Sequence, residues 1–184
     1  MALVGSIHVN HGTKLPEFSL QDASGVSYQS SQLAGEEGLL VVVTCNHCPY
    51  AIAVWPRVIR LAKAFRAKGI NTVAINPNIH PDYQEDSPEA MKEKAIEWGI
   101  DFPYLVDADQ SVSKALDAQC TPDIYLYNAD GELYYHGRID DYWKDENKVT
   151  KQELIPAVEA MIAGHEAPAT QYPTIGCSIK WLDE

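Results

Sequence analysis

Residues 39–50 read Leu-Leu-Val-Val-Val-Thr-Cys-Asn-His-Cys-Pro-Tyr, and this stretch decides the fold. Its first five residues form an unbroken aliphatic run with three β-branched side chains, which is typical of a strand buried on both faces in a parallel sheet. The run leads into a Cys-x-x-Cys step at Cys45 and Cys48, and Pro49 suits the first turn of a following helix. The stretch predicts a buried strand that delivers two cysteines to the start of a helix.

A cysteine at such a strand-to-helix step is expected to be reactive. Unpaired backbone N–H groups and the positive end of the helix dipole stabilise a thiolate, and they bring the pKa from ~8.5 to about 3.5–7.5. We therefore predict that Cys45 attacks disulfides and that Cys48, one helical turn on, resolves the mixed disulfide. His47 either favours the thiolate, when protonated, or is an exposed loop residue.

The cysteine pair could instead have a role without redox chemistry. A structural zinc site usually needs two more ligands at close spacing, whereas Cys120 and Cys177 stand alone in the sequence. The pair could also be two inert thiols, since free cysteine packs as a small hydrophobic residue.

Outward from this stretch, strands alternate with helices. In the first half of the chain we predict a short hairpin over 16–28, the buried strand over 39–43, an amphipathic helix ending at Gly69, a strand over 70–75 and a helix over 88–98. In the second half we predict a strand over 104–106, a helix over 111–118 and a hairpin of strands over 123–127 and 132–137. A last helix is predicted from the capping box at Thr150 and Glu153 to Gly164. This order predicts an α/β fold with a central mixed β-sheet flanked by helices.

Length and composition indicate one folded domain over residues 1–184. The 184 residues are 46% hydrophobic and 22% charged, as in ordinary globular domains. The tail over 165–184 carries two large apolar side chains, Ile179 and Trp181, so we expect it to dock on the domain. Acidic residues outnumber basic ones 26 to 14, and the net charge of -12 argues against nucleic acid or an anionic membrane as partner. Basic residues cluster on the helix after Cys48, so the surface near the site is expected to be less negative.

The four cysteines also bear on the compartment. They are too few for a disulfide-stapled miniature scaffold, and residues 1–5 lack the basic segment and apolar run of a secretory signal. No stretch approaches the ~20 apolar residues of a membrane span. We therefore expect the reducing cytoplasm, where a close cysteine pair exchanges electrons or binds metal.

A second motif supports electron exchange. Cys120-Thr121-Pro122-Asp123 stands immediately before a predicted strand, and with the cysteine pair it makes the chain resemble the thioredoxin-like superfamily, in its peroxiredoxin-like branch (AhpC/TSA, redoxin). The carriers of this resemblance are Phe-Ser-Leu-Gln-Asp-Ala-Ser-Gly (18–25), Thr-Cys-Asn-His-Cys-Pro-Tyr (44–50), Val-Ala-Ile-Asn (73–76), Glu-Asp-Ser (85–87), Phe-Pro-Tyr-Leu-Val-Asp (102–107), Cys-Thr-Pro-Asp (120–123) and Gly-Cys-Ser-Ile-Lys-Trp (176–181).

The resemblance implies a thioredoxin-like fold with an N-terminal β-hairpin. Pro122 would be a cis-proline beside the active site, and the backbone of Thr121 would pair with an extended substrate like an added strand. It implies thiol-disulfide exchange through Cys45 and Cys48 with no organic cofactor and no metal. The partners would be a protein or small-molecule disulfide and a cellular thiol reductant.

The chain also departs from the patterns of thioredoxins and of peroxiredoxins. Thioredoxins carry Trp before the first cysteine and an acidic residue on the incoming strand; here Thr44 precedes Cys45 and the strand over 39–43 is wholly apolar. Proton transfer from Cys48 must then use water, His47 or a distant group. The Pro-x-x-x-Thr-x-x-Cys loop of peroxiredoxins is absent, so disulfide exchange ranks above peroxide reduction.

The remaining two cysteines leave alternatives open. Cys120 lies two residues from Pro122 and is either a third redox partner or an inert thiol, with the inert interpretation ahead. Cys177 is a resolving cysteine or part of a lid if the tail docks over the site, and a core residue if it docks elsewhere. The aromatic residues Tyr134, Tyr135, Tyr142 and Trp143 are expected to serve packing more than peptide binding.

Three further functions remain as alternatives. The first is a thiol peroxidase with an antioxidant role. The second is a copper-binding module in which Cys45, Cys48 and a histidine such as His80 or His136 hold the metal, because thiolates suit Cu(I); copper-handling relatives generally space their cysteines by three residues, not two. The third is a non-enzymatic interaction domain, which the intact cysteine pair disfavours.

Overall fold

The computed structural model describes residues 2–182, and its elements follow the predicted order closely. The helices are α1 (Pro49–Arg66), α2 (Pro88–Trp98), α3 (Ser111–Ala115) and α4 (Leu154–Ile162). The strands are β1 (Leu3–Gly5), β2 (Ser19–Asp22), β3 (Ser27–Gln29), β4 (Gly38–Val43), β5 (Ile70–Asn76), β6 (Tyr104–Val106), β7 (Cys120–Thr121), β8 (Asp123–Asn128), β9 (Leu133–His136) and β10 (Ile175–Ser178).

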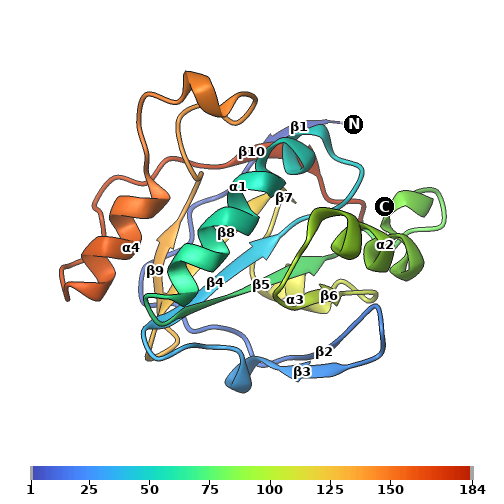
Figure 1. The fold of residues 1–184 in the computed structure, drawn as a ribbon, viewed down its shortest axis with the longest axis horizontal. Helices are drawn as coiled ribbons and strands as arrows, with labels where there is room; N and C mark the ends of the chain where they lie inside the picture. The colour runs from blue at the N-terminus through green and yellow to red at the C-terminus, as the bar shows by residue number, and fades with distance from the viewer. Residues whose placement is uncertain (1, 183–184) are drawn as a thin grey trace.

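Seven of these strands form one mixed sheet in the order β3-β2-β6-β5-β4-β8-β9 (Figure 1). β4, β5 and β6 run parallel, whereas β8, β9 and the β2–β3 hairpin pair antiparallel. The prediction of an α/β fold with a central mixed sheet and an N-terminal hairpin is confirmed.

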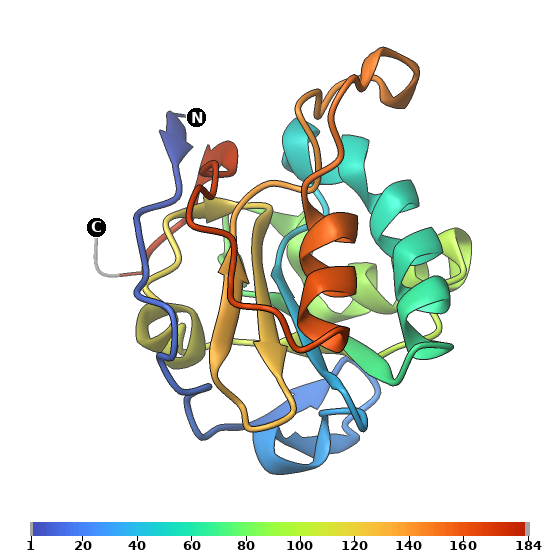
Figure 2. The same ribbon diagram turned by 90° about the vertical axis from the view of Figure 1, so that its left-hand side faces the viewer.

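β4 lies near the middle of this sheet, and all six of its residues are buried. Alternate side chains point to opposite faces, as the two-residue period of a strand requires. Leu40 and Val42 pack in the core beneath α1 and α4, whereas Leu39, Val41 and Val43 pack in the core on the side of α3. Figure 2 shows these two layers on either side of the sheet. This double burial explains why the run is aliphatic throughout.

The sequence did not indicate a second, smaller sheet. It has the order β1-β10-β7, with both pairings antiparallel, so that β10 lies between β1 and β7 (Figure 1). β10 belongs to the C-terminal tail, which therefore docks on the domain as expected; residues 183–184 lie outside the described part. The tail thus docks beside β7, the strand that directly precedes Pro122.

Two predictions about the helices are wrong. The capping box at Thr150 and Glu153 does not form: Thr150 bonds to Asp141, Glu153 pairs with Arg138, and α4 begins only at Leu154. α3 ends at Ala115 and not at residue 118.

Three basic residues of α1 form ion pairs. Arg57 is buried and bonds to Asp140, while Arg60 pairs with Glu146. Arg66 likewise pairs with Asp101.

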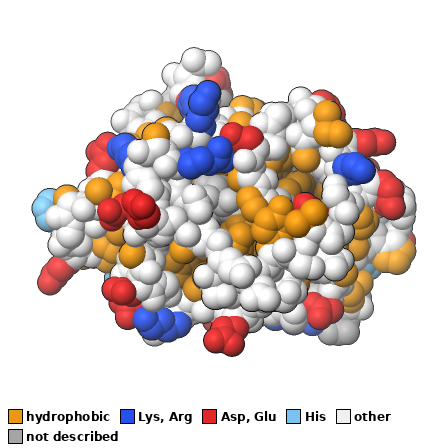
Figure 3. Space-filling model, turned by 60° about the horizontal axis from the view of Figure 1, so that its bottom comes forward, with side chains coloured by type: hydrophobic (Ala, Val, Ile, Leu, Met, Phe, Trp, Pro, Cys, Tyr) orange, Lys and Arg blue, Asp and Glu red, His pale blue; other side chains and the backbone are white. Residues whose placement is uncertain are grey.

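Two hollows of the described surface lie beside the β2–β3 hairpin, on the face that Figure 3 presents, where apolar side chains gather. One hollow, of about 670 Å³, is lined by residues such as Phe18, Leu20 and Val112, and a second of about 420 Å³ lies toward α2. No cysteine lines either of them. Among the helices of residues 2–182, none has both the length and the apolar composition needed to cross a bilayer.

Candidate active site

The cysteine pair lies at the carboxyl end of β4, beside the end of β5 and the start of β8. The Thr44 N–H donates to the carbonyl of Ile75 on β5 at 2.8 Å, which fixes the chain just before the pair. The Thr121–Pro122 peptide bond is cis, as the resemblance predicted. Thr121 contacts both cysteines: its hydroxyl lies 3.2 Å from the Cys45 sulfur, and its carbonyl accepts a hydrogen bond from Cys48 at 3.1 Å.

All four cysteines are free and buried. Cys45, Cys48 and Cys177 pack together in one small cluster with Ala51. Cys120 lies outside this cluster; its thiol donates to the carbonyl of Pro122 at 3.5 Å, and burial raises its pKa well above the usual value. The geometry favours the inert interpretation of Cys120 and brings Cys177 to the site.

The structure corrects the prediction about which thiol meets the helix. α1 begins at Pro49, after the pair, so that Cys48 and not Cys45 is its N-cap residue. A hydrogen bond joins the two sulfurs, and it lowers the pKa at which the pair loses its first proton to about 4, helped by the backbone N–H groups of Ala51 and Cys177. Burial and the charge of Asp86 oppose ionisation of Cys45. The Cys48 thiol, however, donates to the Thr121 carbonyl, whereas the Thr121 hydroxyl can donate to the Cys45 sulfur, so these contacts favour Cys45 as the thiolate of the pair.

This assignment predicts a pH titration. Reduced protein should hold one thiolate per chain at pH 6, where an ordinary cysteine would be only about 0.3% ionised. The thiolate absorbance near 240 nm should fall with a midpoint near pH 4 as the pH is lowered, in line with the pKa of about 4 at which the pair loses its first proton. Cys45→Ser and Cys48→Ser should each remove this transition, because each takes away one partner of the hydrogen bond between the two sulfurs, and Cys120→Ser should leave it in place. A first ionisation above pH 8 would contradict the assignment.

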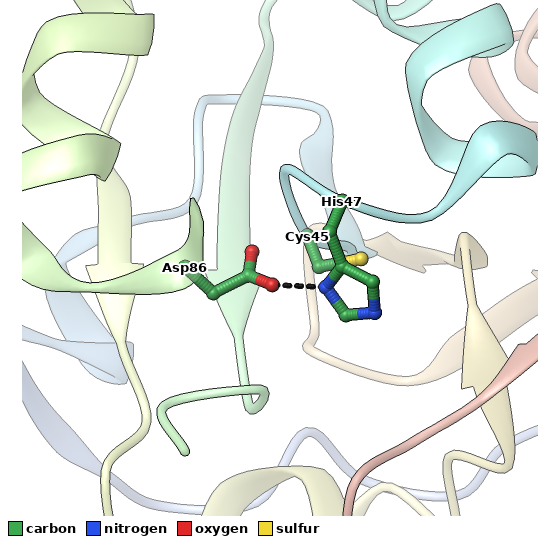
Figure 4. Close-up of side chains that lie close together, drawn as sticks. All are labelled: Cys45, His47 and Asp86. Carbon is green, nitrogen blue, oxygen red and sulfur yellow. Dashed lines mark hydrogen bonds and ion pairs between the residues drawn. The ribbon is translucent and has the colours of Figure 1, made fainter. Parts of the chain in front are cut away.

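Asp86 organises the loop that carries the pair (Figure 4). Its carboxylate is fully buried; Oδ2 accepts a hydrogen bond from Nδ1 of His47, and Oδ1 accepts from the Asn46 N–H at 2.6 Å and the Asn76 side chain at 2.9 Å. His47 also stacks on Tyr83, with ring centroids 4.6 Å apart. The side chain of His47 is only 7% exposed, so its interpretation as an exposed loop residue is wrong.

Asn46 and Tyr104 complete this buried polar network. The Tyr104 hydroxyl donates to the Asn46 side chain at 2.9 Å, and that side chain donates to the carbonyl of Glu85 at 2.8 Å. Sequence reasoning assigned no role to Asp86, Asn76 or Tyr104. One signal for this network was present in the sequence: Asn76 is a polar residue at the end of a buried strand. Ligands of α/β sheets bind beside the carboxyl ends of the parallel strands, so a polar side chain at such an end is a candidate site residue.

The fold and the site are shared with a known protein family. A model of the Redoxin family matches residues 10–154, which include Cys45, Cys48, Thr121 and Pro122. The chain belongs to the Redoxin family. A crystal structure of an uncharacterized conserved protein from Geobacillus kaustophilus is similar to it at 37% sequence identity, with a TM-score of 0.93, over 100% of this chain and 98% of that one.

Two further proteins place this redoxin among thioredoxin-like folds. The thiol-disulfide oxidoreductase ResA of Bacillus subtilis is 26% identical over 129 residues, which are 70% of this chain and 68% of that protein. The thioredoxin domain of a thiol-disulfide oxidoreductase from Bacteroides vulgatus has the same fold, with a TM-score of 0.59 at 17% identity over 70% of this chain and 89% of that chain. The fold of the redoxin is thioredoxin-like.

The structure does not gather the copper ligands that the sequence suggested. His136 is buried in the core, where its Nε2 lies 2.8 Å from Asp123 and its ring stacks on Tyr125. Within residues 2–182, the one group of three candidate metal-ligating residues close enough to share an ion is Cys45, His47 and Asp86. Neither His80 nor His136 therefore joins the cysteine pair of this redoxin.

The aromatic residues mostly serve packing, as predicted. Tyr134 and Tyr135 are buried, and their hydroxyls donate to backbone carbonyls of residues 165, 166 and 138. Trp143 packs on Tyr50 in the first turn of α1, with ring centroids 3.9 Å apart. Tyr142 is exposed.

Proposed function

We propose that this redoxin is a thiol-disulfide oxidoreductase that works through the dithiol Cys45/Cys48. The observation that carries the proposal is the arrangement of the two sulfurs: Cys45 and Cys48 are hydrogen-bonded to each other at the N-terminus of α1, and both contact Thr121 of the cis-proline step. A thiolate with a second thiol in contact is what a two-step disulfide exchange requires. The name of the Bacillus subtilis relative, a thiol-disulfide oxidoreductase, supports the same activity.

The mechanism keeps the roles that the sequence suggested for the two cysteines. The Cys45 thiolate attacks one sulfur of the substrate disulfide, and the other substrate sulfur leaves as a thiolate that takes up a proton. The mixed disulfide on Cys45 is then attacked by Cys48, which forms the Cys45–Cys48 disulfide and releases the second substrate thiol. Two electrons pass from the dithiol to the substrate, and a cellular thiol reductant restores the dithiol.

His47 lies beside the attacking sulfur, since Cys45, His47 and Asp86 have their ligand atoms within 4.8 Å of one another. We assign His47, oriented by Asp86, as the group that takes up the proton of Cys45 when the nucleophile forms. The proton of Cys48 passes to water in the second step, because β4 carries no acidic residue.

The substrate would pair with the backbone of Thr121, next to the two sulfurs, as an added strand. Main-chain pairing places a disulfide without demanding a particular sequence, so a protein disulfide in an extended segment would fit this edge once β10, which pairs with β7 here, has separated from it. The compartment proposed remains the reducing cytoplasm, where the thiol reductant is supplied.

Mapping the disulfide that forms tests this proposal. Reduced protein is incubated with one equivalent of an oxidised peptide disulfide, quenched with acid, alkylated and digested. We expect two thiols to be released from the peptide for each chain oxidised, and a disulfide that includes Cys48. Failure of any cysteine to react would contradict the proposal. The same mapping with hydrogen peroxide distinguishes a peroxidase, whose reaction with peroxide would be far faster than that of a free thiol.

A further inference from the structure

The edge of β7 at which a substrate would pair is occupied by a segment of the chain itself. β10 pairs antiparallel with β7, and Cys177 lies opposite Thr121 while Ser178 lies opposite Cys120. Figure 1 shows β10 as the middle strand of the small sheet, with β1 on its other side. β10 therefore takes the place that a substrate strand needs.

Cys177 stands in this strand where a substrate cysteine would have to stand. Its side chain packs in one cluster with Cys45, Cys48 and Ala51, and its sulfur is hydrogen-bonded to that of Cys48. Cys45 and Cys48 are fully buried beneath β10. A strand in the register of β10 thus brings a sulfur to the cysteine pair, and β10 shows how such a strand is seated.

The residue before this cysteine lies too close to β7 to carry a side chain. A Cβ atom at Gly176 would overlap the carbonyl oxygen of Thr121 and would lie 2.7 Å from its carbonyl carbon. Cβ atoms essentially never come within 3.0 Å of such atoms. Both atoms belong to the backbone of β7, so no rotation of a side chain relieves the overlap. In this register, the position directly before the cysteine accepts glycine and no other residue.

A short pairing holds β10 to β7, between two anchors of the tail. Only two residue pairs join these strands. Before β10, Thr174 and Ser6 exchange two hydrogen bonds of 2.9 Å; after it, the Lys180 N–H donates to the Asn78 side chain at 2.9 Å. A glycine within a strand also weakens it. Residues 175–178 can therefore leave β7 by local opening while both anchors stay in place.

We propose that β10 is an internal copy of the substrate strand, and that this redoxin prefers protein disulfides in which glycine directly precedes the reacting cysteine. Such a segment replaces β10 on β7, with its glycine against Thr121 and its sulfur at the cysteine pair. Cys45 then attacks that sulfur, the other substrate sulfur leaves and takes up a proton, and Cys48 resolves the mixed disulfide. The proposal rests on the proposed function, whose substrate class it names.

The selection works by exclusion. A substrate with a larger residue before its cysteine has to pair farther from Thr121, and its sulfur then lies farther from Cys45. Discrimination of this kind comes from a clash with the unwanted partner and not from an added contact with the preferred one. The backbone of Thr121 is therefore the part of the protein that sets the preference.

Two synthetic peptides test this preference in the unmodified protein. One has the sequence of residues 174–179, and the other has alanine in place of its glycine; each is used as its symmetrical disulfide. The reduced protein should release thiol from the glycine peptide about tenfold faster or more, because the added methyl group overlaps β7. Dithiothreitol, which has no strand edge, gives the intrinsic ratio of the two rates, and the ratio with the protein is compared with it.

The outcomes separate this inference from the function on which it rests. If the protein reduces both peptides with the same rate ratio as dithiothreitol, the preference for glycine is overturned and the oxidoreductase activity stands. If the protein releases no thiol from either peptide, the proposed function itself is overturned.

A pair of glycine variants tests whether β10 and the substrate share one place. Gly176→Ala should displace β10 from β7, so that the glycine peptide is reduced about tenfold faster or more, because the edge is free without local opening. Gly5→Ala is the matched control, since a Cβ on β1 at residue 5 would meet only the carbonyl of Thr174 at an ordinary 3.7 Å. Circular dichroism checks that both variants are folded. Reduction of the peptide no faster by Gly176→Ala than by Gly5→Ala would contradict the shared place.

Discussion

Cys45→Ser is expected to lower the rate of protein disulfide reduction by on the order of 10³-fold or more, because it removes the sulfur that begins the reaction. No other thiol of the cluster can begin the reaction in its place, because the Cys48 thiol donates to the Thr121 carbonyl and burial raises the pKa of Cys177 to about 12. The measurement is the steady-state reduction of a protein disulfide such as that of insulin, with dithiothreitol as the reductant. A serine hydroxyl has nearly the size of the thiol, so the variant should remain folded.

Two further variants make this prediction specific. Cys48→Ser should still form the mixed disulfide on Cys45, because it keeps the nucleophile. Cys120→Ser should match wild type, since that thiol is buried apart from the cluster and bonds to the carbonyl of Pro122. The opposite pattern, in which Cys48→Ser loses the first step and Cys45→Ser keeps it, would make Cys48 the attacking thiol.

The residues around β4 show what a sequence can predict here. The aliphatic run over 39–43 could form only a doubly buried strand, and the turn signals on either side located β5, β6 and β8 nearly to the residue. The strands follow from local features, in which the period of the side chains and the turn chemistry act within a few residues. The cis-proline was expected only from the resemblance to the thioredoxin-like superfamily, which Cys120–Asp123 and the cysteine pair carry together.

The first residue of α1 could not be predicted from the local sequence. Pro49 is compatible with a helix that begins at Cys45 and with one that begins after Cys48, since proline suits any position of the first turn. The contacts of Asn46 and His47 with Asp86 decide between them, by holding residues 46 and 47 in a loop outside the helix. Asp86 is 40 residues from Asn46. No sequence pattern near either residue indicates this contact.

The strand pairing of the C-terminal tail was harder to predict than the start of α1. β10 is the short segment Ile-Gly-Cys-Ser, which has no alternation of apolar and polar residues and carries a glycine, normally unfavourable in a strand. Its pairing depends on the backbone of β7 and β1, which lie more than 50 and 170 residues away in the chain. The sequence could therefore name Cys177 as a candidate, but it could not show that Cys177 meets Cys48.

The buried carboxylate of Asp86 leads to the second large effect. Asp86→Ala is expected to lower the free energy of unfolding of the reduced protein by about 3–5 kcal/mol, because three buried donors lose their acceptor at once and each unsatisfied donor costs about 1–3 kcal/mol. Those donors are the Asn46 N–H, the Asn76 side chain and Nδ1 of His47. Unfolding in urea, followed by tryptophan fluorescence, measures the change.

Asp86→Asn is the control that separates the charge from the hydrogen bonds. Its amide keeps the shape and one acceptor oxygen, so the expected loss of stability is smaller, about 1–2 kcal/mol. The charge is gone, however, and because the charge of Asp86 raises the pKa of Cys45, that pKa should fall in the Asn variant. Thiol titration of a Cys48→Ser, Asp86→Asn protein against Cys48→Ser alone detects this change. If Asp86→Ala is as stable as wild type, or if the pKa of Cys45 does not fall in the Asn variant, Asp86 does not hold the loop and the thiol as the geometry requires.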